Sequence, residues 1–459
     1  MRVTVLNGSP KGDVSVTMQY VNFIAKKFPE HDLKIINISQ HIKPIEKNEA
    51  RFKAIVADME GSDLIIWAFP VYVCLVPSQY KRFIELLFER KATGKLSGKY
   101  STAITTSVHF YDHTAHNYIQ SVSEDMGMQH IGGYSADMHD LMEPQEREKF
   151  LKFANHVFET VEKKNRLAKS FSSLPLSIFK YNSGKAKEAI SSEGKKILVL
   201  TDAVPGQDNL IKMVNRFCQS FSERVEVINL RELDIKGGCL GCYECGYDNT
   251  CVYSGKDGFS EFYKNRVGDA DIVIFAGTIR DRYLSSMWKC YFDRVFFNTH
   301  IPTLTGKQTG FIISGPLCHI TNLRQILESY CEWQQSNLAG IVTDESENDT
   351  LIDENLQVLA ESAMKYSQEG YFKPRTFFAV AGMKLFRDEV WGRIRFVFQA
   401  DHRYYKKHGF YDFPQKDFKT QGINLVLCTL MKIPAFRKEF KKRIKTEMIK
   451  PLQNVVKNK

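Results

Sequence analysis

The chain has 459 residues, a length that fits two or three domains better than one. Hydrophobic residues make up 43% and charged residues 25%, which is the balance of an ordinary globular protein and excludes a disordered or collagen-like chain. The net charge is +10, but residues 429–459 alone hold ten Lys and Arg against two Glu. This uneven charge argues against nucleic-acid binding as the main activity. A solvated basic helix is expected there, with an acidic partner or a membrane surface as the alternative.

No apolar run reaches the roughly 18 residues that a membrane helix needs, so no transmembrane segment is expected. A strand-like run, residues 3–6, follows Met1 almost directly, and no apolar signal region with a cleavage site precedes it. These two observations predict a cytoplasmic protein.

The first predicted strand ends in the loop Asn7-Gly8-Ser9-Pro10-Lys11, and a helix with Ser15 and Thr17 near its start follows. Glycine lets the backbone approach a ligand, hydroxyl groups donate to oxygen atoms, and the free N–H groups of a helix start favour an anion. The loop therefore suits a phosphomonoester. The alternative is an ordinary turn and helix cap built from the same residue types.

A later predicted strand, residues 64–68, runs into Pro70-Val71-Tyr72, and a helix containing Lys81 follows. Ligands of open α/β sheets lie outside the carboxyl ends of the strands, so this loop and the first loop would face one crevice. An apolar strand end stiffened by proline can lie against a flat ring. The alternative is a strand end that is simply packed.

The chain repeats itself at a long period. Asp63-Leu-Ile-Ile-Trp-Ala aligns with Asp271-Ile-Val-Ile-Phe-Ala at an offset of 208 residues (63 against 271), whereas the first strands align at 194 (3 against 197). The second copy therefore carries 14 extra residues, 208 less 194, before its Asp271 strand. Each copy alternates short apolar strands with helical segments, which is typical of βαβ units and a parallel sheet.

Four of the ten cysteines lie between the first strand of the second copy and its Asp271 strand, with the spacing C-x2-C-x2-C-x5-C. Reduced cysteines grouped this densely indicate metal binding or catalysis rather than a disulfide framework. Structural zinc usually takes two separated pairs of ligands, whereas three cysteines at successive i, i+3 steps wrap one loop around a compact object. We expect a [4Fe–4S] cluster, with zinc or a loop without metal as alternatives. The expected ligands are Cys239, Cys242, Cys245 and Cys251.

Residues 1–165 resemble the NAD(P)H-dependent FMN reductase family of flavodoxin-like proteins. The resemblance rests on the Asn-Gly-Ser-Pro loop, the Pro-Val-Tyr loop and the following helix with Pro77-Ser78 and Lys81. The resemblance implies that the FMN phosphate is held by Ser9, Lys11, Ser15 and Thr17. It also implies that the isoalloxazine pocket is formed by Pro70, Val71, Tyr72, Thr105, Thr106 and Ser107. No strand is followed by Gly-x-Gly-x-x-Gly, so NAD(P)H, as a transient donor, would stack on the flavin.

The cysteine spacing resembles the iron-sulfur flavoproteins, which are relatives of the FMN reductases. The second copy departs from the flavin motifs, because Thr201-Asp202-Ala203-Val204 and Thr278-Ile279-Arg280 replace the two loops and Asp202 would repel a phosphate. The sequence therefore predicts FMN in the first copy, the cluster in the second, and the two copies packed as a pseudo-dimer. This arrangement is also compatible with a homo-oligomer of the whole chain.

The expected fold class is α/β, with two tandem flavodoxin-like doubly wound parallel-sheet domains and a mainly helical C-terminal extension. The predicted boundaries are 1–165 for the FMN domain, 166–195 for a linker, 196–370 for the domain with the iron-sulfur loop and 371–459 for a basic, aromatic extension. The aromatic residues of the extension are expected to pack in a core. His109, His113 and His116, with Asp112, are interpreted as a polar loop over the flavin rather than a metal site.

These features predict an NAD(P)H-dependent oxidoreductase that moves electrons between NAD(P)H or a reduced carrier, FMN and the cluster. A redox partner protein or a small-molecule acceptor would complete the reaction. One alternative is a flavin or quinone reductase whose cysteine loop is only structural, and another is a non-enzymatic redox sensor or scaffold. No acid or base pair stands out, so no catalytic side chain is predicted, because the cofactors carry the chemistry.

Overall fold

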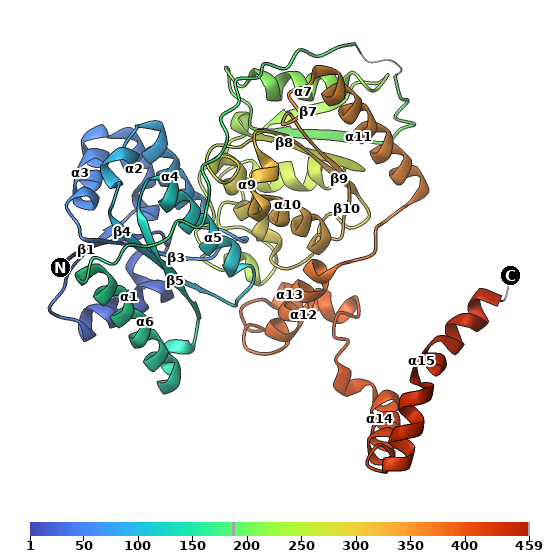
Figure 1. The fold of residues 1–459 in the computed structure, drawn as a ribbon. Coiled ribbons are helices and arrows are strands. Elements are labelled where there is room, and N and C mark those ends of the chain that lie inside the picture. The colour runs from blue at the N-terminus through green and yellow to red at the C-terminus, as the bar shows by residue number, and fades with distance from the viewer. Residues whose placement is uncertain (186–188, 458–459) are drawn as a thin grey trace. The chain divides into compact units, whose positions relative to one another are not determined.

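The computed structural model describes residues 1–185 and 189–457 (Figure 1). Residues 186–188 of the predicted linker and residues 458–459 of the predicted extension, with the basic Lys459, lie outside the described residues. The chain divides into two compact units, Met1–His402 and Arg403–Lys459, and each is described by itself.

The first sheet has five parallel strands in the order β2-β1-β3-β4-β5. The strands are β1 (Arg2–Asn7), β2 (Asp32–Asn37), β3 (Leu64–Pro70), β4 (Tyr100–Ser107) and β5 (Gln129–Asp137). The surrounding helices are α1 (Val16–Lys27), α2 (Ile42–Lys47), α3 (Glu49–Glu60), α4 (Ser78–Glu89), α5 (Asp112–Asp125) and α6 (Pro144–Glu162). Alternate residues of β3 belong to different clusters, Leu64 and Ile66 to one and Ile65 and Trp67 to the other. Helices cover both faces, so the central strand is continuously apolar.

The second sheet also has five parallel strands, in the order β10-β9-β8-β6-β7. Its strands are β6 (Ile197–Thr201), β7 (Glu226–Asn229), β8 (Ile272–Thr278), β9 (Gln308–Ser314) and β10 (Asn337–Thr343). Its helices are α7 (Asp208–Cys218), α8 (Phe259–Phe262), α9 (Ser286–Val295), α10 (Thr321–Trp333) and α11 (Asp349–Glu369). Read from the β7 edge, the order matches that of the first sheet. The predicted α/β class with two doubly wound parallel sheets is confirmed.

The remaining helices are α12 (Phe377–Trp391), α13 (Gln399–Lys407), α14 (Phe418–Leu430) and α15 (Pro434–Lys457), so the predicted helical character of the C-terminal region is also confirmed. In the first unit α12 packs on α10. The predicted aromatic core holds for Phe398, which is buried beside His300, but not for Phe396, which is 78% exposed. Within the described residues, no helix combines the length and the hydropathy needed to cross a membrane.

The segment predicted as a linker is partly packed where the structure describes it. The backbone N–H groups of Ser170 and Phe171 donate to Glu124 Oε2 at 2.9 and 2.7 Å. Tyr181 is fully buried in the core of the second sheet domain. These contacts tie the segment to both sheet domains.

The two sheet domains meet through α4 and α9 (Figure 1). Glu85, the eighth residue of α4, accepts hydrogen bonds from the backbone N–H and the hydroxyl of Ser286 at the start of α9, at 2.6 and 2.5 Å. Asp293, the eighth residue of α9, accepts from the N–H of Ser78 at the start of α4, at 2.8 Å. Each helix thus caps the N-terminus of the other with a carboxylate, which satisfies free N–H groups and the positive end of the helix dipole.

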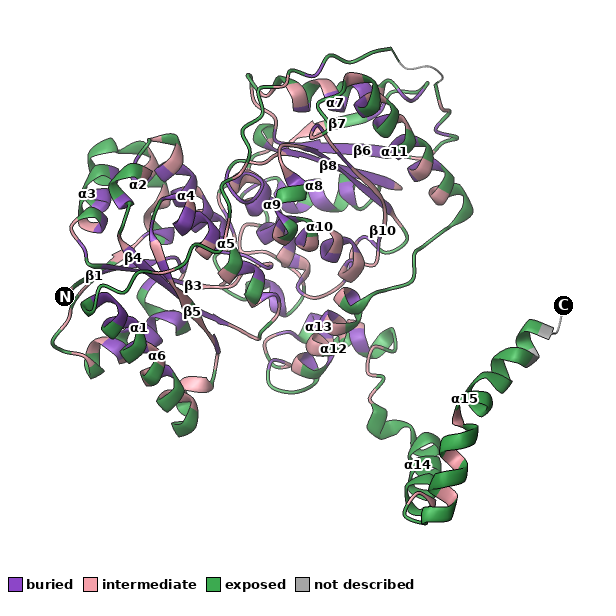
Figure 2. Ribbon diagram, viewed as in Figure 1, coloured by how far each residue is buried: buried purple, intermediate pink, exposed green. Residues whose placement is uncertain are grey.

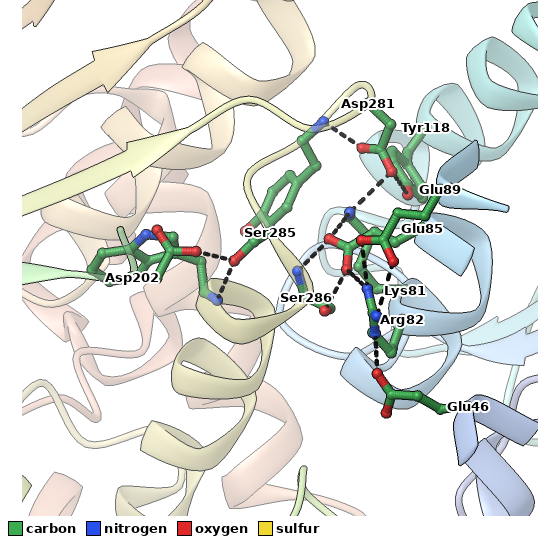
Figure 3. Close-up of polar contacts among 12 residues, drawn as sticks. Glu46, Lys81, Arg82, Glu85, Glu89, Tyr118, Asp202, Asp281, Ser285 and Ser286 are labelled. Carbon is green, nitrogen blue, oxygen red and sulfur yellow. Dashed lines mark hydrogen bonds and ion pairs between the residues drawn. The ribbon is translucent and has the colours of Figure 1, made fainter. Parts of the chain in front are cut away.

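A buried lysine accompanies each of these carboxylates. Lys81 Nζ lies 2.9 Å from Glu85 Oε1 and 2.9 Å from Asp281 Oδ2, and the Tyr118 hydroxyl donates to Asp281 (Figure 3). Burial opposes ionisation of Glu85, but Lys81 holds its pKa below the usual value. For Asp281 burial prevails, and its pKa is raised despite Lys81. The interface is therefore held by buried ionisable groups that contact one another instead of water.

The second lysine extends this network to the ring loop of the first domain. Lys289 Nζ pairs with Asp293 and donates to the carbonyl oxygen of Tyr72 at 2.8 Å. Lys289 and Asp293 are both buried. The interface between the domains therefore also positions the backbone of the predicted flavin loop.

Candidate functional site

Three predicted flavin-binding segments meet at the carboxyl edge of the first sheet. They follow β1, β3 and β4, which are neighbours in the sheet. The hydroxyl oxygens of Thr17 and Thr106 lie 2.6 Å apart, and the N–H of Val71 donates to the carbonyl of Thr106 at 3.1 Å. The structure thus brings the phosphate loop, the ring loop and the β4 end together, as expected for strands with parallel neighbours.

The phosphate loop, residues 7–17, is a compact turn with buried hydroxyl groups. Ser9 Oγ accepts from the N–H of Lys11 at 3.2 Å, and Ser15 Oγ caps α1 by accepting from the N–H of Met18 at 3.3 Å. Gly8 packs so closely that a Cβ there would lie 2.7 Å from the Tyr80 ring. Ser15 therefore serves as the N-cap of α1, and the turn keeps Ser9 and the start of α1 together at the sheet edge.

The ring loop, residues 70–75, is a tight reversal in which Val73 and Cys74 adopt positive φ angles of 37° and 67°. The Tyr72 hydroxyl is buried and, among the described residues, has no hydrogen-bond partner. Burial of this hydroxyl, together with nearby ionisable side chains, raises the pKa of Tyr72. An unpaired buried hydroxyl is costly, so this position is poised for a further polar contact.

Thr105 lies near the end of β4, and the histidines follow it, His109 before α5 and His113 and His116 within α5. Thr105 Oγ1 lies 2.7 Å from His116 Nε2, and burial lowers the pKa of His116. His109 Nδ1 lies 2.8 Å from Asp112, which also accepts from Ser135. Within the described residues these histidines are not part of any group of three ligating side chains whose ligand atoms all lie within 4.8 Å of one another. Ser107 Oγ accepts from the N–H of His109.

The cysteine loop, residues 236–258, connects β7 to α8 and surrounds one cavity. The cavity is lined by all four predicted ligand cysteines together with Tyr253, Arg294, Phe296 and Phe297. Yet no three of the four sulfur atoms, all of which the structure describes, lie within 4.8 Å of one another. Sulfur atoms around one tetrahedral zinc, each about 2.3 Å from the metal, would lie about 3.8 Å apart.

The thiols of this loop lie in a poorly solvated environment. Burial raises the pKa of Cys239 to about 12. Burial, with the neighbouring cysteines adding to it, raises the pKa of Cys245 as well. Thiolates at such positions require a cationic partner, which a bound metal centre supplies.

Arg294 of α9 holds the two ends of the cysteine loop together. Its guanidinium donates to the carbonyl of Gly237 at 2.9 Å and to both oxygens of Asp257 at 2.7 and 2.9 Å, and it lies over the Tyr253 ring. The side chain is 1% exposed and adds a positive charge to the cavity wall. Arg294 is not among the predicted site residues. The signal that could have found it is the repeat, in which this charged residue replaces the apolar Leu86 of the first copy.

The cysteine loop of the second sheet domain lies on the flavin loops of the first. Lys11 Nζ lies 3.9 Å from the centre of the Tyr243 ring. The side-chain amide of Gln79 donates to the carbonyl of Cys239 at 3.1 Å. A Cβ on Gly241 would overlap the Tyr72 hydroxyl, and only glycine allows this approach. The cysteine loop and the predicted flavin loops, which belong to different sheet domains, are therefore in direct contact.

Residues 1–140 match the model of the NADPH-dependent FMN reductase family. The match covers most of the first sheet domain. It supports the predicted NAD(P)H-dependent flavin oxidoreductase. No curated protein matches the chain.

Several solved structures are similar to part of this chain. The apo form of an NADH:FMN oxidoreductase (EMOB) has 16% identity and a TM-score of 0.30, with 37% of this chain and 91% of that chain covered. An oxidoreductase from Corynebacterium diphtheriae has 17% identity and a TM-score of 0.31, covering 35% and 96%. An azoreductase from Bacillus anthracis has 11% identity and a TM-score of 0.25, covering 36% and 99%.

The equivalent crevice of the second sheet domain differs from that of the FMN reductase domain. Asp202, at the position of Gly8, is buried and accepts from the Ser285 hydroxyl (Figure 3). Arg231 lies 3.7 Å from Asp202. Burial raises the pKa of Asp202. A carboxyl group therefore stands where the first domain has a glycine beside its phosphate loop. Elsewhere in this domain, Cys318, His319 and Glu345 bring their ligating atoms within 4.8 Å, a grouping that sequence analysis did not find.

Proposed function

We propose that this flavin oxidoreductase carries FMN in its first sheet domain and a [4Fe–4S] cluster on Cys239, Cys242, Cys245 and Cys251 in the second, and that electrons pass between them. The observation that carries the proposal is the contact of the cysteine loop with the flavin loops, through Lys11 and Tyr243 and through Gln79 and Cys239. Two redox groups held by adjoining loops of one protein are positioned for exchange without a separate carrier.

FMN held in the first domain would supply hydride chemistry towards NAD(P)H, and a cluster held in the second would supply one-electron chemistry. In this arrangement Ser9, Lys11, Ser15 and Thr17 hold the phosphate, and Pro70, Val71 and Tyr72 line the ring with Thr105, Thr106 and Ser107. NAD(P)H would be the transient hydride donor to this site. A partner protein or small molecule outside the chain is the other electron carrier.

The cysteine cavity suits a cluster in shape and charge. Phe296 and Phe297 line the cavity together with the four cysteines. Arg294 also lines it, and its guanidinium is held in place by Asp257 and the carbonyl of Gly237. Such outer groups orient metal ligands and adjust the metal centre.

We also propose that the two sheet domains arose by tandem duplication and now form a pseudo-dimer. Their strand orders match, and the reciprocal caps of Glu85 on Ser286 and Asp293 on Ser78 relate residues that are 208 positions apart in the repeat. A symmetric dimer interface places the same surface of each subunit against the other, and this interface has that character.

The first test is the cofactor content of the full chain purified without oxygen. We expect one FMN and about four irons with matching sulfide per chain, and an absorbance spectrum that combines flavin with broad cluster absorption. Flavin alone, or zinc in place of iron, would support the alternative of a flavin or quinone reductase with a structural loop. Two flavins per chain would contradict the division of labour, since Asp202 occupies the second crevice.

A charge placed in the phosphate loop tests the assigned orientation of FMN. Ser9→Asp keeps an oxygen that accepts from the N–H of Lys11 but adds a negative charge, and it should weaken FMN binding at least about tenfold. Ser9→Asn is the matched control, because it is nearly the same size and neutral. Binding titrations with riboflavin, which lacks the phosphate, should show no such difference between the variants. Equal loss for FMN and riboflavin would refute a phosphate at this loop.

A further inference from the structure

The C-terminal unit, Arg403–Lys459, contains a helix that presents apolar side chains to water. No residue of α14 is buried, and Phe418, Leu425 and Val426 are 78%, 71% and 59% exposed (Figure 2). Residues 418–430 include one Lys and no Asp or Glu. Folded proteins rarely leave so continuous an apolar surface uncovered unless it is a site of interaction.

The adjoining helix α15 combines positive charge with further exposed apolar residues. Apolar residues recur at every fourth position from Phe436 to Leu452, and Met448 and Leu452 are 68% and 63% exposed. Only Glu439 and Glu447 carry negative charge in residues 431–456. The basic side chains among the described residues of this segment are Lys432, Arg437, Lys438, Lys441, Lys442, Arg443, Lys445 and Lys450.

We propose that this C-terminal unit binds the surface of an anionic phospholipid bilayer. Apolar residues of α14 would enter the boundary between headgroups and acyl chains, and the lysines of α15 would contact lipid phosphates. Helices with this pairing of apolar and basic residues lie in the membrane interface, and clusters of four to eight Lys and Arg favour anionic lipids. With 13 residues, α14 is shorter than the roughly 20 that a spanning helix needs, which places it on the surface.

Other occupants fit this surface less well. A second copy of the chain would bring two strongly basic helices together, and like charges repel. A nucleic acid would complement the lysines of α15 but not the apolar residues of α14. A lipid surface complements both, because it offers negative charge and an apolar interior at adjacent depths.

The experiment is sedimentation of the full chain with vesicles of phosphatidylcholine alone or of phosphatidylcholine mixed equally with phosphatidylglycerol. We expect binding to the anionic vesicles, at least about tenfold weaker binding to the neutral ones, and a loss of binding as salt is raised. Leu425→Asp with Val426→Asp should abolish binding through α14. Lys441→Glu with Lys442→Glu and Lys445→Glu should abolish it through α15.

Two controls carry the same chemical changes on other exposed helices. Lys149→Glu with Lys152→Glu and Lys163→Glu reverses three lysines that are 64%, 73% and 64% exposed, and Val358→Asp alters an apolar residue of α11 that is 56% exposed. Both controls should bind like the unchanged chain. Flavin content and the far-ultraviolet circular dichroism spectrum of each variant verify that it is folded.

Three results would overturn the proposal. The first is equal binding to neutral and anionic vesicles. The second is binding that survives both sets of C-terminal substitutions. The third is no vesicle binding together with self-association in analytical ultracentrifugation that Leu425→Asp with Val426→Asp removes, which would assign the surface to a second copy instead.

Discussion

Serine in place of Cys239 and Cys245 is expected to remove most of the iron and sulfide from the chain while FMN stays bound. The two sulfur atoms line the same cavity, and each would bind a different iron, so losing both leaves too few thiolates to hold a cluster. The residues assigned to FMN belong to the other sheet domain, which is why flavin should be retained. Iron and sulfide analysis, with extracted flavin measured on the same sample, checks both expectations.

The matched control is Cys218→Ser with Cys428→Ser, which removes two cysteines outside the loop, one half-buried and one exposed. Iron, sulfide and flavin should all keep the values of the unchanged chain. If the loop variant also kept its iron, the cysteine loop would not be the cluster site. If it lost zinc rather than iron, the loop would be structural.

Removing the positive charge of Lys81 is expected to destabilise the protein strongly. The Lys81 side chain is fully buried between Glu85 and Asp281 (Figure 3). Lys81→Met keeps most of its length but leaves Asp281 without a cation and Glu85 with Arg82 alone. Breaking a buried pair in this way costs about 3–5 kcal/mol of unfolding free energy. Urea unfolding followed by circular dichroism should show the loss, with the midpoint as the readout because two domains need not unfold in one step.

The same variant should show a distinct pH dependence. In the unchanged chain the lowered pKa of Glu85 means that its ionised form stabilises the fold at neutral pH, and this contribution is lost as the pH falls below the ordinary carboxyl range. Without Lys81 the buried carboxylates gain by protonation instead. The gap in stability between the two proteins should therefore narrow as the solution is made more acidic.

Lys34→Met is the control for Lys81→Met. Lys34 forms an ion pair with Asp58 at 2.6 Å, but its side chain is 60% exposed, so its loss should cost less than about 1 kcal/mol. If the two variants had equal unfolding midpoints, the interface lysine would contribute no more than a surface charge. The proposed importance of the α4 and α9 contact would then fail.

Much of the fold could be predicted because it depends on neighbours in the chain. The run Leu64 to Phe69 is continuously apolar because a central parallel strand is covered on both faces. The repeat of this run at Asp271 predicted a second such sheet. The flavin loops are also local, since parallel strands deliver their carboxyl ends to one edge. The spacing of the four cysteines was by itself enough to predict that they share one metal centre.

Other parts of the site depended on contacts between residues far apart in the chain. Lys81 looks like any helical lysine in the sequence, and only packing against Asp281, two hundred residues away, buries it and gives it a structural role. Arg294 stands in an otherwise ordinary helix until folding places it between Gly237 and Asp257.

By itself, then, the sequence determined two parallel sheets, the loops at their carboxyl edges and a cysteine group, because hydrophobic periodicity and short motifs act over a few residues. Only the tertiary structure decided that Lys11 meets Tyr243 and that Gln79 meets Cys239, joining these parts into one site. The physical reason is that the docking of α4 on α9 depends on shape and on buried charge pairs, and neither leaves a pattern along the chain.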